Sequence, residues 1–165
     1  MFGTTALAVD DLQIYSSELN KFSLQMPSGW EMIEQKKEDV TNPVNIEIVA
    51  PENLASVLVM VPKDGKPSCA ETLRAMDDSR KKKNLVKPDQ SKITKDILTA
   101  AKAEEGAVGE YLIEGKGPGF PVVQKSYCFK SKDQIRIVTV AYQKAKGARF
   151  EPLFKKVISS FQFNP

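Results

Sequence analysis

Hydrophobic residues fill every second position in several short stretches of this sequence, which is the spacing of a β-strand with one buried face. Residues 22–26 show this alternation first, and residues 45–50 show it again. Residues 55–61 are apolar on both faces, as expected of an inner strand that is covered on both sides. The first part of the chain therefore predicts strands, one of them central in a sheet.

The second half of the chain has the same period of two. It predicts three successive strands, at residues 108–114, 122–130 and 134–143. Turn-forming residues separate them at 115–119 and 131–133, and connections this short join antiparallel neighbours. Residues 93–101 fit either a strand or part of a helix, and we favour the strand.

Two segments instead have the three- and four-residue spacing of a helix. The first begins at Ser68, because Ser68 and Glu71 form a capping box in which each side chain accepts from the other residue's backbone N–H. Pro88 is its latest possible end. The second runs from Pro152 to Phe161, since a proline in the first helical position loses no hydrogen bond. Together these elements predict an α+β fold, a twisted antiparallel β-sheet flanked by helices in an α/β/α sandwich.

A chain of 165 residues without repeats or linkers fits a single domain, which we place at residues 12–165. No apolar run approaches the ~20 residues that span a bilayer, so we do not expect a membrane-spanning protein. Lys and Arg number three against nine Asp and Glu in residues 1–62, and twenty-one against twelve in residues 63–165. Because basic residues are interspersed with acids, we expect no nucleic-acid binding.

The N-terminal residues resemble the end of a secretory signal. Ala6-Leu7-Ala8 is a small-x-small triplet of the kind found at signal-peptide cleavage sites, without the basic and apolar regions that precede such a site. We interpret residues 1–11 as an export-signal remnant or a disordered N-terminus. This interpretation predicts an extracytoplasmic protein, periplasmic or secreted.

The chain lacks residue types that most catalytic centres use. It contains no histidine, which excludes Ser-His-Asp and Cys-His catalysis and every histidine-based zinc site. Adjacent acids such as Glu104-Glu105 lack the spacing of a calcium loop. The S-x-x-K letters of Ser79 to Lys82 come without the companion motifs of penicillin-recognising enzymes. We predict no enzyme, no catalytic residue, no metal and no cofactor.

The two cysteines, Cys69 and Cys128, have no metal-binding spacing. In an oxidising compartment they form a disulfide if their Cα atoms lie within about 7 Å, and otherwise they are two small buried side chains. The sequence does not give that distance, so both alternatives stay open.

The segment from Gly115 to Pro121 is the most unusual in the sequence. It lacks the G-K-[ST] of a phosphate-binding loop, and Pro118 removes an N–H that a phosphate cradle would use. One interpretation is a plain hairpin connection. The other is a loop that presents Lys116 and Phe120 to a partner, because exposed aromatic side chains on loops tend to mark contacts.

Both ends of the domain resemble a known superfamily. Residues 22–30, which read F-S-L-Q-M-P-S-G-W, look like the opening strand and turn of the PsbP/Mog/DcrB superfamily, and residues 146–161 look like its closing segment. The resemblance spans residues 12–163. It implies an α/β/α sandwich around an antiparallel sheet, adaptor or assembly roles, and no shared catalytic residues. From the residues alone, we expect Trp30 to pack in the core at the edge of the sheet.

These observations favour a non-enzymatic, extracytoplasmic protein-interaction or assembly module that docks on another protein or an envelope complex. One alternative is a periplasmic binding protein that holds a small or lipidic ligand in a cleft between sheet and helix. Another is a secretion chaperone, which needs an exposed groove and no signal peptide. The sequence names neither the partner nor the oligomeric state.

Overall fold

The computed structural model describes residues 11–34, 44–62, 68–80, 85–89 and 93–165. Its elements follow in the order β1 (Leu12–Ser17), β2 (Phe22–Pro27), β3 (Glu31–Glu34), β4 (Val44–Val49), η1 (Pro51–Asn53), β5 (Ala55–Met60), α1 (Cys69–Arg80), β6 (Leu85–Asp89), α2 (Lys95–Ala101), β7 (Glu105–Ile113), β8 (Val122–Ser131), β9 (Gln134–Gln143), η3 (Lys144–Lys146), α3 (Gly147–Ser160) and β10 (Gln162–Phe163).

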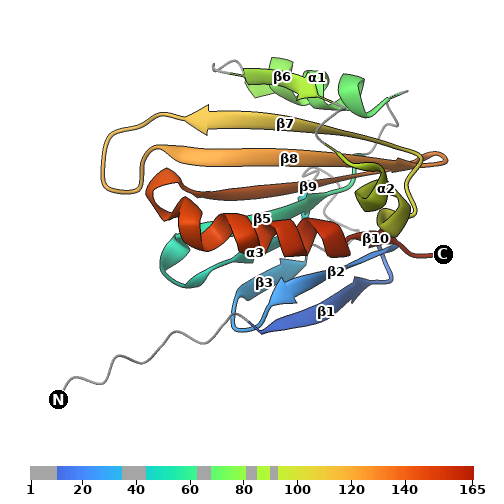
Figure 1. Ribbon diagram of the computed structural model, residues 1–165, viewed down its shortest axis with the longest axis horizontal. Helices are drawn as coiled ribbons and strands as arrows, with labels where there is room; N and C mark the ends of the chain where they lie inside the picture. The colour runs from blue at the N-terminus through green and yellow to red at the C-terminus, as the bar shows by residue number, and fades with distance from the viewer. Residues whose placement is uncertain (1–10, 35–43, 63–67, 81–84, 90–92) are drawn as a thin grey trace.

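The strands form two antiparallel sheets (Figure 1). The larger has the order β3-β4-β5-β9-β8-β7-β6, and the smaller has the order β1-β2-β10. The three predicted strands of the second half are confirmed as β7, β8 and β9, which are neighbours in the larger sheet. Lys132 turns the chain between β8 and β9 with a φ of 53°, the left-handed conformation that short hairpin connections use.

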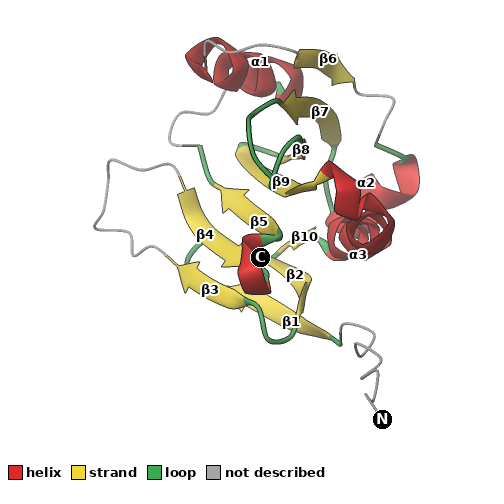
Figure 2. Cartoon of the chain, turned by 90° about the vertical axis from the view of Figure 1, so that its left-hand side faces the viewer, coloured by secondary structure: helices red, strands yellow, loops and turns green. Residues whose placement is uncertain are grey.

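The helices lie on both faces of the larger sheet (Figure 2). On one face α1 packs against β6, β7 and β8. On the other face α3 packs against β9 and against β2 of the smaller sheet, with α2 beside it. The arrangement confirms the predicted α+β fold with helices flanking an antiparallel sheet.

Two apolar clusters fill the space between these layers. In the main core, the ring of Phe161 lies with its centroid 4.6 Å from that of Phe129 and 5.9 Å from that of Phe22. A smaller cluster under α1 includes Cys69, Leu73, Cys128 and Ile137. Strand β9 faces both clusters, because Ile137 belongs to the smaller one and Val138 to the main core. Alternate side chains of the sheet thus build two separate cores.

Residues 95–101 form helix α2, so the strand favoured for residues 93–101 was wrong. Thr94 is the N-cap of α2, and its hydroxyl accepts a hydrogen bond from the Ile97 N–H at 3.4 Å. Ile93 lies just before this cap and is buried, and Ile97 and Ala101 are four residues apart on one face of the helix, where Ala101 is buried and Ile97 packs against the main core. The period of this segment is therefore that of a helix.

Helix α3 begins at Gly147 and not at Pro152, which lies inside it. Phe150 in the first turn is fully buried, and the Tyr142 hydroxyl donates a hydrogen bond to Glu151 at 2.8 Å. These contacts stabilise the first turn and offset the backbone hydrogen bond that Pro152 is unable to donate.

Helix α1 begins directly after Ser68, as predicted, and ends at Arg80. The Ser68 hydroxyl oxygen accepts from the Glu71 N–H at 3.1 Å, which confirms half of the capping box. The other half differs, because the Glu71 carboxylate accepts from the Ser68 hydroxyl at 3.0 Å and not from its N–H. Pro88 lies in β6, an unpredicted edge strand, where a missing N–H is tolerated.

Candidate functional site

The loop between β7 and β8, residues 114–121, carries both contact residues that the sequence predicted. The chain turns at Gly117, whose φ of +120° is rarely accessible to other residues. The Phe120 N–H donates a hydrogen bond to the Gly117 carbonyl oxygen at 3.3 Å. Lys116 is exposed, and Phe120 is 44% exposed. The structure brings Lys116 and Phe120 together on one tightly turned loop.

Phe120 packs on its own loop and not on the core. A Cβ atom at position 115 would lie 2.5 Å from the Phe120 ring, so the ring lies directly on the backbone of Gly115. The ring belongs to neither buried cluster. This contact fixes the place of the ring while much of its surface remains in solvent.

The loop is tied to the end of the larger sheet. The Pro121 carbonyl oxygen accepts from the Lys144 N–H at 2.9 Å, next to the Gln143 N–H, which donates to the Leu54 carbonyl oxygen at 3.4 Å. Beside these contacts lies a groove of about 350 Å³, with Leu54, Gly119, Val122 and Gln143 in its lining. Because backbone hydrogen bonds hold both walls, the groove is a preformed surface feature.

Charged side chains surround the loop. Figure 1 shows the β7–β8 loop and the start of α3 at the same end of the larger sheet. We call this surface, formed by residues 114–121 and 144–149, the loop end. Its exposed charged residues are Glu114, Lys116, Lys144, Lys146 and Arg149. The excess of cations suits a partner with acidic side chains.

A second concave site lies between α2, α3 and the neighbouring face of β8 and β9. It has a volume of about 350 Å³, and Val140, Phe154 and Ile158 form its nearly fully buried apolar floor. Lys125 and Tyr127 from β8 and Lys155 from α3 also line it. We call this site the helix–sheet cleft, since it has the geometry of the sheet–helix cleft considered from the sequence.

Two tyrosines in the helix–sheet cleft are held in the neutral form. Burial raises the pKa of Tyr142 far above its ordinary value, and the hydrogen bond to Glu151 raises it further. Burial also raises the pKa of Tyr127, with smaller contributions from the negative charges of Glu110 and Glu151. Both phenols therefore keep their hydroxyl protons and act as hydrogen-bond donors.

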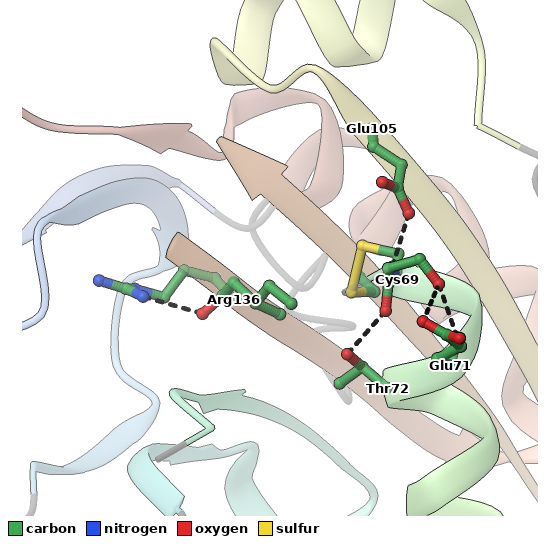
Figure 3. Close-up of a disulfide and its surroundings, with 8 residues drawn as sticks. Cys69, Glu71, Thr72, Glu105 and Arg136 are labelled. Carbon is green, nitrogen blue, oxygen red and sulfur yellow. Dashed lines mark hydrogen bonds between the residues drawn. A yellow bond between two sulfur atoms is a disulfide. The ribbon is translucent and has the colours of Figure 1, made fainter. Parts of the chain in front are cut away.

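Cys69 and Cys128 form a disulfide, which joins the start of α1 to β8 (Figure 3). Their Cα atoms lie 5.5 Å apart, and both side chains are fully buried. Glu105 on β7 accepts a hydrogen bond from the Cys69 N–H at 2.6 Å. Of the two alternatives that the sequence left open, the structure shows the bridge.

Arg136 is a buried charged residue that the sequence analysis missed (Figure 3). Its Nε donates to the Asn20 carbonyl oxygen at 2.8 Å, and its Nη1 donates to the Ile135 carbonyl oxygen at 2.8 Å. The guanidinium carbon also lies 5.8 Å from the ring centroid of Phe163. Burial lowers the pKa of Arg136. These contacts connect β9 to the β1–β2 turn and to β10, which indicates a structural role.

The remaining residues that the sequence analysis discussed are Trp30, the adjacent acids Glu104 and Glu105, the N-terminal triplet and Lys82. Trp30 is half-buried at the edge of the main core, with its ring edge-on to those of Phe150 and Phe154 at centroid distances of 6.2 and 6.1 Å. Glu104 accepts from the Lys132 N–H at 3.3 Å, and its neighbour Glu105 binds α1. Ala6-Leu7-Ala8 and Lys82 lie outside the described residues.

The described residues include neither a metal-binding group of side chains nor a membrane-spanning helix. Within the described ranges, no group of three His, Cys, Asp or Glu side chains is placed to hold a metal ion. In the same part of the chain, no helix combines the length and the apolar character needed to cross a membrane.

The fold and the two surface sites define a small antiparallel α+β domain with concave binding surfaces. The sequence profile of the PsbP family matches residues 10–163, so the chain belongs to the PsbP family. No curated protein matches the sequence.

Solved structures share the fold of this chain. The solution structure of cyanobacterial PsbP (CyanoP) from Synechocystis sp. PCC 6803 aligns with a TM-score of 0.59 at 15% identity, and the alignment covers 99% of this chain and 98% of that one. A crystal structure from Bacteroides thetaiotaomicron VPI-5482 aligns with a TM-score of 0.53 at 13% identity, and covers 92% of this chain and 48% of that one. At these identities the likeness concerns the fold.

Proposed function

We propose that this PsbP-family protein is a non-enzymatic, extracytoplasmic docking module that binds another protein through the loop end. The observation that carries the proposal is the position of Phe120, which is 44% exposed yet held against Gly115 beside the exposed Lys116. An aromatic ring that is already fixed in place loses little conformational entropy on binding, and such rings dominate the affinity of protein interfaces.

The surroundings of Phe120 support a protein partner. Gly119, its neighbour in the chain, lines the 350 Å³ groove, which is large enough to accept a side chain from a partner. The cations Lys116, Lys144 and Lys146 would steer an acidic surface toward the ring. The partner is therefore a protein with acidic residues around an apolar contact.

The disulfide supports the extracytoplasmic location. Disulfides persist in oxidising compartments and are rare in the cytosol of most organisms. The Cys69–Cys128 bridge is fully buried and joins two elements of the fold, as structural disulfides do. The signal-like triplet Ala6-Leu7-Ala8 favours the same location.

Comparative co-purification from the native host tests the proposal. Tagged wild-type protein and the Phe120→Ala and Ile14→Ala variants are recovered, and bound proteins are quantified by mass spectrometry. Ile14 is 76% exposed on β1 of the smaller sheet and is not among the residues of the loop end, so it is a matched apolar control. Loss of an interface aromatic weakens binding by about thirtyfold, so a partner should be recovered with wild type and Ile14→Ala but not with Phe120→Ala. Equal recovery with all three would contradict the proposal.

A further inference from the structure

The helix–sheet cleft has a lysine on each of two walls, one on β8 and one on α3. Lys125 and Tyr127 are two residues apart on β8, so their side chains lie on the same face of the sheet. Lys155 lies on α3, which forms the opposite wall, and it lines the same cleft. The view of Figure 2 shows α2 and α3 side by side over this face of β8 and β9. Cations from two walls thus flank one cavity.

Three of the donors that line this cleft have no partner in the part of the chain that the structure describes. Among the described residues, the Tyr127 hydroxyl has no hydrogen-bond partner and neither lysine forms an ion pair. Burial raises the pKa of Tyr127, so its hydroxyl stays protonated. With one phenol donor and two ammonium groups that have no partner among residues 11–34, 44–62, 68–80, 85–89 and 93–165, the cavity suits a ligand with strong hydrogen-bond acceptors.

Two carboxylates lie near this region, and their negative charges oppose the positive charges of the two lysines. Glu151 lines the cleft, but one of its oxygens already accepts the Tyr142 hydroxyl at 2.8 Å. Glu110 lies directly opposite Lys125 in the register of β7 and β8, and it does not line the cleft. Within the lining itself the two lysines outnumber the one carboxylate, which favours an anion over a cation.

We infer that the helix–sheet cleft binds a small amphipathic carboxylate. Its head group lies between Lys125 and Lys155 and accepts a hydrogen bond from Tyr127, and its apolar body lies on Val140, Phe154 and Ile158. The cleft volume of about 350 Å³ is at the lower end of the roughly 300–1,000 Å³ of small-molecule sites. The ligand is therefore a medium-chain acid and not a complete phospholipid. This site is separate from the loop end and goes beyond the proposed docking function.

Titration with octanoate tests the inference, with octylammonium and octanol as ligands of equal chain length and different charge. Methyl resonances of Ile97 and Ile158 report on the cleft, because both residues line it. Trp30 fluorescence gives a second readout, since its ring packs edge-on against Phe154. Octanoate should shift both signals and should bind at least tenfold more tightly than octylammonium or octanol.

Variants of the lining assign the binding energy to the named groups. Each of Lys125→Gln and Lys155→Gln should weaken octanoate binding about threefold to fivefold, as expected for charge contacts near the surface. The double variant should weaken it at least tenfold. Tyr127→Phe should weaken it about threefold through the lost donor. Lys156→Gln is the control, since Lys156 is the exposed neighbour of Lys155 and is not in the lining.

Three results would overturn the inference. The first is octylammonium binding as tightly as octanoate, which would mean that the cleft does not prefer a negatively charged head group. The second is unchanged octanoate affinity in the double lysine variant, with its fold verified by circular dichroism. The third is the absence of any octanoate-induced shift of Ile97 or Ile158 below the micelle-forming concentration. None of these results depends on whether the loop end binds a protein.

Discussion

Removal of the Cys69–Cys128 disulfide should strongly lower the stability of the folded chain. The bridge links positions 59 residues apart, and both cysteines are fully buried. In the chain-entropy treatment, closing a loop of this length removes about 14 cal/mol/K from the unfolded state, which is about 4 kcal/mol at 25 °C. A typical domain has only about 5–15 kcal/mol of stability in total.

The variant Cys69→Ala/Cys128→Ala should therefore lose about 4 kcal/mol of unfolding free energy. Urea denaturation followed by Trp30 fluorescence and far-ultraviolet circular dichroism measures the loss. The slope of the transition should also rise, because the unfolded chain without the crosslink is less compact and exposes more surface. Reductant is the matched control, since it should lower wild-type stability toward that of the variant and leave the variant unchanged.

Either of two results would contradict this stabilising role of the disulfide. A loss of less than about 1 kcal/mol in the double variant would mean that the bridge does not constrain the unfolded chain as the loop length requires. A wild-type protein that denatured at the same urea concentration with and without reductant, after complete reduction verified by thiol titration, would lead to the same conclusion.

Two further predictions concern buried polar groups. Arg136→Met should lower the unfolding free energy by about 2–3 kcal/mol in urea titrations, because it leaves the carbonyl oxygens of Asn20 and Ile135 without their donors; an unchanged midpoint would contradict the structural role of Arg136. The raised pKa of Tyr142 predicts that stability falls as the pH rises above 10, since the unfolded chain then loses the phenol proton before the folded protein does. Tyr142→Phe should flatten this fall in urea titrations at pH values on either side of 10, and an identical pH slope in the variant would contradict the assignment.

The strands that the sequence predicted well follow one of two patterns. Strand β4 alternates, since Ile46 and Ile48 are buried and Glu47 between them is exposed. Strands β5 and β9 are inner strands of the larger sheet, and their long apolar runs are typical of strands covered on both faces. Strand β1 was missed because its burial does not alternate, and its Ile14 is 76% exposed. Helix α2 had a usable signal in the capping residue Thr94 and in the four-residue spacing of Ile97 and Ala101, which the strand interpretation overlooked.

The sites depend on contacts that sequence spacing does not encode. Lys116 and Phe120 were identified because they lie within one turn-rich segment, and proximity within a loop follows from chain connectivity. The helix–sheet cleft draws its lining from β8, β9, α2 and α3, so no local motif marks it. The distance between Cys69 and Cys128 likewise depends on how α1 packs on the larger sheet. The fold was therefore easier to predict than the surfaces that it builds.

Site-specific photo-crosslinking in the native host tests the central claim, that the loop end docks on a protein, most directly. A photoreactive amino acid is placed at position 120, and at position 156 for comparison, since Lys156 is exposed on α3 outside the loop end. We expect a discrete protein adduct from position 120 and none from position 156. No adduct from position 120, or the same adducts from both positions, would contradict this claim.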